Sequence, residues 1–197
     1  MEKLYYKKAI VIVHGKSELQ ICQYIKNNLR LPIEIISDSN GEKSIQITSL
    51  KNTIYNTKFK SLSSFLRNFP VDYDKKSKKI SPEFKIFMIM DTDDCTEDQV
   101  KMYKNKKMFE KHWAYDYFYP IYNSMNLEDV LSKAKIPYKK CGKERKKEYI
   151  KLFPTDPDYK KTDVVQLQEF YSKLKKIKSL KISNLDEFIE FCINSVH

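Results

Sequence analysis

The chain has 197 residues, of which 41% are hydrophobic and 32% are charged, and its formal net charge is +11. This length and apolar content suit one domain with a sizeable core and exclude an intrinsically disordered chain. The excess of basic residues predicts a polyanionic partner such as nucleic acid, although a general richness in lysine accounts for the charge equally well.

The sequence carries no pattern that predicts secretion or membrane insertion. No apolar run approaches the roughly 20 residues of a membrane span, and the opening residues MEKLYYKK do not lead into a signal-type apolar stretch. Four cysteines are widely scattered without a C-x-x-C pair, so neither a structural zinc site nor a disulfide framework is predicted. We expect a cytoplasmic protein that does not contact membranes.

The first elements alternate between strand and helix. Residues 9–13 (AIVIV) are a β-branched run typical of a strand that is buried on both faces. An amphipathic pattern then predicts a helix over 18–29 with Ser17 as its N-cap, followed by a second strand over 33–37. After a turn at Asn-Gly, residues 45–48 either pair back as a hairpin strand or begin another helix.

The remaining elements continue this alternation and then become helical. In chain order we expect a helix over 60–69, a polar connection over 72–83, a strand over 84–90 and a helix from Thr96 to about Phe109. A strand over 117–123 follows, with Pro120 at an edge or bend, and then a helix over 126–134. The last third consists of a lysine-rich segment over 139–151 that is helical from Lys143, a long helix over 164–177 and a last helix capped by Ser183 or Asn184. The pattern predicts an α/β domain over 1–137, with a largely parallel central sheet flanked by helices, and a helical C-terminal extension over 138–197 packed on it.

Two of the predicted strands end abruptly in polar and charged residues, in IVIVHGKSE (10–18) and IFMIMDTDD (86–94). Ligands of open parallel sheets bind at the carboxyl ends of the strands, so these two ends meet if the strands are neighbours. Glu18 lies on the apolar stripe of its helix, which directs its carboxylate toward Asp91. Asp91 and Asp93 alternate along an extended chain and therefore project to one side.

Clustered carboxylates repel one another unless a cation neutralises them. Carboxylate oxygens suit Mg²⁺ or Mn²⁺, and such an ion can activate water or bind a phosphate. The plainer interpretation is that these acids are ordinary loop and helix-start residues, with Glu18 favouring the helix dipole. We favour the metal site because both strand ends carry acidic residues that would meet at the same edge of the sheet.

These motifs resemble the Toprim fold, which is shared by primases, topoisomerases, small ribonucleases and the nuclease modules of phage-defence proteins. The resemblance covers roughly residues 8–135 and rests on VHGKSE, on DTDD and on the strand-then-acidic-helix stretch YPIYNSMNLEDVL. It implies that Asp91 and Asp93 hold Mg²⁺ and that Glu18 is the second acid of the first motif. Asp94 and Glu128 are further candidates, although Glu128 also suits a plain helix start.

His14 stands where the first strand of the Toprim family ends in glutamate. An imidazole can take up a proton near neutral pH, so His14 either replaces that general acid or base or marks a site without chemistry. Lys16 is placed to meet a phosphate. The densest basic stretch, KKCGKERKK, offers further phosphate contacts or forms a solvated surface; its candidates are Lys139, Lys140, Lys143, Arg145, Lys146 and Lys147.

Together these features predict a Mg²⁺-dependent enzyme that acts on phosphodiesters of DNA or RNA, a nuclease of the bacterial defence or repair type. The alternative is a degenerate Toprim-like module that binds nucleic acid or a partner protein of a defence system without chemistry. A third reading is a small-molecule phosphotransfer or regulatory domain. The pattern does not set the oligomeric state.

Overall fold

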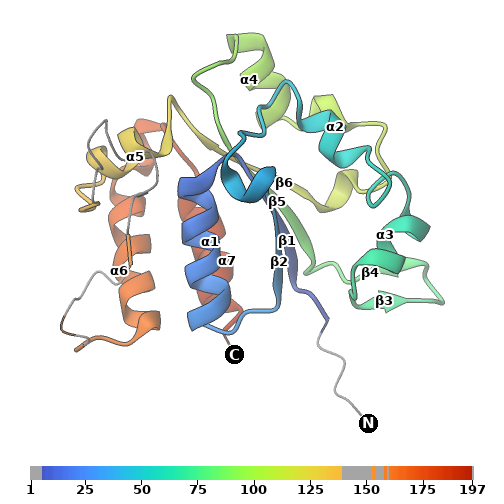
Figure 1. Ribbon diagram of the computed structural model, residues 1–197, viewed down its shortest axis with the longest axis horizontal. Coiled ribbons are helices and arrows are strands. Elements are labelled where there is room, and N and C mark those ends of the chain that lie inside the picture. The colour runs from blue at the N-terminus through green and yellow to red at the C-terminus, as the bar shows by residue number, and fades with distance from the viewer. Residues whose placement is uncertain (1–5, 139–151, 154–157, 159, 197) are drawn as a thin grey trace.

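The structure is a computed structural model that describes residues 6–138, 152–153, 158 and 160–196 (Figure 1). Its strands are β1 (Ala9–Val13), β2 (Ile33–Ile36), β3 (Tyr73–Asp74), β4 (Lys79–Ile80), β5 (Lys85–Asp91) and β6 (Phe118–Asn123). Its α-helices are α1 (Lys16–Asn28), α2 (Leu50–Ile54), α3 (Leu62–Asn68), α4 (Glu97–Lys104), α5 (Leu127–Lys133), α6 (Asp163–Lys176) and α7 (Leu185–Asn194). Short 3₁₀ turns are η1 (Ser39–Gly41), η2 (Lys107–Phe109), η3 (Tyr115–Tyr117) and η4 (Lys178–Leu180).

The main sheet has four strands in the order β2-β1-β5-β6, and every pair of neighbours is parallel. All five residues of β1 are buried, as expected for a central strand covered on both faces. The predicted α/β class with a parallel sheet flanked by helices is therefore confirmed, and the arrangement is consistent with a Toprim-like fold. Pro120 lies in the edge strand β6, where a missing backbone donor is tolerated.

Each face of the sheet buries its own hydrophobic core. Helices α1, α5, α6 and α7 cover one face, and α2, α3 and α4 cover the other (Figure 1). The C-terminal helices belong to the first core, where Phe188 of α7 meets Phe87 of β5 at a ring-centroid distance of 5.1 Å. No helix in the described ranges is both long and apolar enough to span a membrane.

Three local expectations differ from the structure. Residues 45–48 form neither a strand nor a helix. They are irregular backbone held beside His14 by the bond from the Ile45 N–H to the His14 carbonyl, and α2 begins only at Leu50. The first helix starts earlier than predicted, with Gly15 rather than Ser17 at its cap. The helix after Thr96 ends at Lys104 instead of Phe109, since Lys106 adopts a left-handed conformation at φ 59°.

The polar connection over 72–83 also holds an unpredicted element, the antiparallel hairpin of β3 and β4. Each of its strands is only two residues long, too short for a pattern of alternating side chains to reveal.

Candidate active site

The pairing of β1 with β5 brings the two charged strand ends together at one edge of the sheet. Val13 lies beside Ile89, and the His14 backbone N–H extends the ladder by donating to the Ile89 carbonyl at 2.9 Å. On the other side of β5, Asp91 pairs with Asn123, the last residue of β6. The convergence expected from the sequence is thus present in the fold.

Glu18 is buried in the first turn of α1, with 3% of its surface exposed. The backbone N–H of Gly15 donates to its Oε2 atom at 3.0 Å, which ties the carboxylate to the end of β1. Burial, followed by the negative charge of Asp91, raises the pKa of Glu18 to about 8. Glu128 adds a smaller effect in the same direction.

Asp91 is the second buried acid, with 6% of its surface exposed. Burial raises the pKa of Asp91 to about 6, although the hydrogen bond from Asn123 and the charge of His14 both lower it. Burial of both carboxyl groups, together with the charge of Asp91 beside Glu18, favours a site that retains a proton or binds a cation.

His14 is half-buried and is held by the irregular segment that begins at Ile45. Its Nδ1 atom lies 3.1 Å from the Ile45 carbonyl oxygen, while the Ile45 N–H donates to the His14 carbonyl at 2.8 Å. A carbonyl can only accept, so Nδ1 carries the hydrogen and Nε2 of the neutral ring keeps its lone pair. This tautomer leaves Nε2 as the nitrogen that can take up a proton.

Glu128 also reaches the site, from the first turn of α5. The Ser17 hydroxyl donates to its Oε1 atom at 3.1 Å, which joins α5 to α1. Asn126 caps α5 by accepting from the Asp129 N–H at 3.0 Å, so Glu128 is also an ordinary first-turn acid. The structure supports both interpretations of this residue.

The remaining candidates lie around this pair of buried acids. Asp93 is exposed in the loop after β5, and its charge contributes to the raised pKa of Asp91. Asp94 accepts a hydrogen bond from Gln46 Nε2 at 2.9 Å and so anchors the segment beside His14. Lys16 is half-buried at the start of α1. All six basic candidates between Lys139 and Lys147 lie outside the described residues.

Sequence reasoning missed two residues that support Asp91. Asn123, fully buried, donates from Nδ2 to Asp91 Oδ1 at 3.0 Å and accepts at Oδ1 from the Ser183 hydroxyl at 2.9 Å. The Ser183 hydroxyl oxygen accepts in turn from the Leu185 N–H at 3.0 Å. Asn123 ends the predicted strand over 117–123, the next strand after DTDD in the chain, and this position was a usable signal. Nothing in the sequence places Ser183 beside it.

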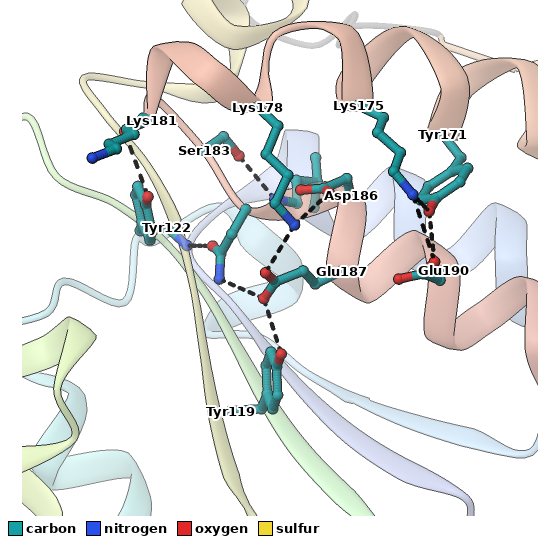
Figure 2. A network of polar contacts seen from close by, with 12 residues as sticks. Tyr119, Tyr122, Tyr171, Lys175, Lys178, Lys181, Ser183, Asp186, Glu187 and Glu190 are labelled. Carbon is teal, nitrogen blue, oxygen red and sulfur yellow. Dashed lines mark hydrogen bonds and ion pairs between the residues drawn. The ribbon is translucent and has the colours of Figure 1, made fainter.

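The start of α7 is fastened to the exposed edge of β6 by the polar network in Figure 2. Asn184 accepts from the Tyr122 N–H at 2.9 Å and donates to the Pro120 carbonyl at 3.1 Å, which satisfies backbone groups of the edge strand. Glu187 accepts from the Tyr119 hydroxyl at 2.9 Å (Figure 2). These contacts fix the segment that presents Ser183 to Asn123.

The fit of a divalent cation to this site rests on its donor set. Two buried carboxyl groups, each accepting a hydrogen bond at one oxygen, lie close enough for the charge of Asp91 to act on Glu18, and such oxygen donors suit a hard cation. Among the described residues, however, no group of three or more His, Cys, Asp or Glu side chains is arranged to hold a metal ion as they stand. Comparison of the chain with protein-family models, curated proteins and solved structures gave no match.

Proposed function

We propose that the protein is a divalent-metal-dependent nuclease with a Toprim-like domain, acting on DNA or RNA in bacterial defence or repair. The observation that carries the proposal is the meeting of Glu18 and Asp91, two buried and mutually repelling acids, at the carboxyl edge of a parallel sheet. Burying carboxylates without a compensating charge is costly, so such a pair is typical of functional sites.

In this proposal Asp91, Asp93 and Glu18 hold Mg²⁺ or Mn²⁺, with Asp94 and Glu128 as outer residues. When bound, the ion supplies charge stabilisation at the phosphate and lowers the pKa of water. Asn123 keeps Asp91 oriented through the 3.0 Å hydrogen bond to Oδ1. Gly15 does the same for Glu18 through its backbone N–H.

His14 and Lys16 have the remaining roles. Nε2 of His14 accepts a proton from the attacking nucleophile, because the Ile45 carbonyl fixes the other ring nitrogen as the donor. Lys16, in the first turn of α1, steadies the substrate phosphate by its charge. The formal charge of +11 favours association with a polyanion.

The test is cleavage of labelled single- and double-stranded DNA and RNA in Mg²⁺, Mn²⁺ or EDTA. Wild type, Asp91→Asn and His14→Ala are compared with Asp116→Ala, an exposed acid in η3 that serves as the matched control. We expect metal-dependent cutting by wild type and control, and a loss of about 100-fold or more in both site variants. Equal cutting by Asp91→Asn would remove the mechanism.

A second candidate is a module that binds nucleic acid or a partner protein without chemistry. The observation in its favour is that the His14 ring, at the position of the family's glutamate, is bonded to backbone at Ile45. This candidate predicts salt-sensitive nucleic-acid binding with no cutting in any metal.

A further inference from the structure

A shallow hollow of about 430 Å³ lies between α4 and the loop that follows β5. Its lining includes Thr92, the residue between Asp91 and Asp93, so the hollow begins next to the candidate active site. Its charged lining residues are Glu97, Lys101 and Lys104, which carry a net charge of +1. Lys101 and Lys104 are three positions apart on α4 and therefore share one side of the helix.

Lys104 is held in place by an aromatic ring of the neighbouring strand. Its amino nitrogen lies 3.4 Å from the ring centroid of Tyr122, a cation–π contact. Burial lowers the pKa of Lys104 below its ordinary value. Within the part of the chain that the structure describes, neither Lys104 nor Lys101 forms an ion pair with a carboxylate.

Lysines in the last turn of a helix also favour the helix dipole, and this accounts for a solvated lysine. It does not account for an amino group that is partly withdrawn from water, positioned by a ring and left without an ion pair to a carboxylate. An anion in the hollow supplies that partner. Carboxylates of Asp91 and Asp93 on the other side of Thr92 repel a free anion, so a ligand that also engages the metal site fits best.

We propose that this hollow binds a backbone phosphate of a nucleic-acid strand, adjacent to the phosphate that occupies the candidate active site. The inference rests on the proposed function for its choice of nucleic acid as the ligand. Lys101 and Lys104 make the phosphate contacts, and Tyr122 positions Lys104. Because these contacts are electrostatic, they contribute to affinity and salt dependence and carry no base specificity.

The experiment measures binding of a short labelled single strand by fluorescence anisotropy in EDTA, over a range of salt concentrations. The variant Lys101→Gln/Lys104→Gln is compared with Lys75→Gln/Lys76→Gln, which removes the same charge from exposed positions of the β3–β4 hairpin. We expect affinity to fall about 10-fold in the first variant at ~0.1 M salt, with the slope of log K against log salt reduced by about 0.7 for the one phosphate released. The hairpin variant should keep the wild-type slope.

A second pair of variants tests the positioning of Lys104. Tyr122→Phe keeps the ring and should bind as wild type does, whereas Tyr122→Leu should lose part of the affinity that Lys104→Gln loses. Cleavage in Mg²⁺ is measured separately on the same proteins. Binding that depends on Lys101 and Lys104 without any cleavage would refute the nuclease and leave the phosphate site standing.

Three results overturn the phosphate site. The first is an α4 double variant that binds with the affinity and salt slope of the hairpin double variant, even if wild type cleaves. The second is a wild type that binds no strand at low salt. The third is competition by poly-glutamate that equals competition by the unlabelled strand, which would assign the hollow to an acidic protein.

Discussion

Replacing Asn123 by leucine removes the link between Asp91 and the C-terminal segment while keeping the branched shape of the side chain. Asn123 makes two buried hydrogen bonds, one of 3.0 Å to a carboxylate and one of 2.9 Å from the Ser183 hydroxyl. A hydrogen bond to a charged group contributes about 1.5–3 kcal/mol and a neutral one about 0.5–1.5 kcal/mol. The expected loss in the free energy of unfolding is therefore about 2–4 kcal/mol.

The assay is urea unfolding followed by circular dichroism, with Asn27→Leu as the control. Asn27 is exposed on α1, and the same substitution there should change stability by less than about 0.5 kcal/mol. Ser183→Ala should cost about half as much as Asn123→Leu, because the carboxylate contact remains. If Asn123→Leu unfolds at the wild-type urea concentration, the contacts around Asp91 do not have the strength assigned to them.

Three further outcomes are expected. Because Glu18 has a folded-state pKa of about 8 and an ordinary unfolded value, the folded chain binds more protons than the unfolded chain between those two values. The free energy of unfolding in EDTA should therefore fall as pH rises from about 4.3 to 8. At pH 8 the Glu18→Gln variant should have a free energy of unfolding at least about 1 kcal/mol above that of wild type, seen as a thermal midpoint about 2–4 °C higher. Gly41→Ala should destabilise by about 1–3 kcal/mol in the same melts, since Gly41 has φ +80° and a Cβ there meets the backbone of Lys16 at 2.9 Å; an unchanged midpoint would contradict this. Tyr103→Phe should cost about 1–2 kcal/mol in urea unfolding, because its buried hydroxyl bonds to carbonyls of β5 and β6, and no loss would show that these bonds are weak.

The sheet and its charged edge were predictable from sequence because strands buried on both faces are continuous apolar runs. The runs AIVIV and KIFMIM allow few alternatives to buried parallel strands, and each ends at the residue after which the polar motif begins. Glu18 was expected to face inward from its place on the apolar stripe of α1, and it is buried. The α/β class followed from the order of the elements.

The surroundings of the site were less predictable because they depend on contacts between distant segments. Ile45 lies 31 residues from His14, and Ser183 lies 60 residues from Asn123. No local propensity specifies either contact, and the irregular backbone around Ile45 has no period to detect. Gly15 replaced Ser17 as the helix cap because the side chain of Glu18 bonds back to the Gly15 N–H.

The buried acids give the candidate site a specific cost in stability. Burial opposes the ionisation of both acids, and the charge of Asp91 further opposes that of Glu18, so the site without a cation is favoured only when it holds a proton. A bound divalent ion removes this penalty and should stabilise the folded chain in proportion to its affinity. Stability and metal binding are therefore two readouts of the same pair of carboxyl groups.

The central claim is tested most directly by calorimetric titration of Mn²⁺ into the protein at pH 7, in two buffers of different ionisation enthalpy. The proposal predicts one bound ion per chain with net release of a proton, because Glu18 must ionise to bind it. Asp91→Asn should abolish this binding, while the exposed control Asp116→Ala should retain it. Absence of binding by wild type, or equal binding by Asp91→Asn, would contradict a metal site at the meeting of β1 and β5.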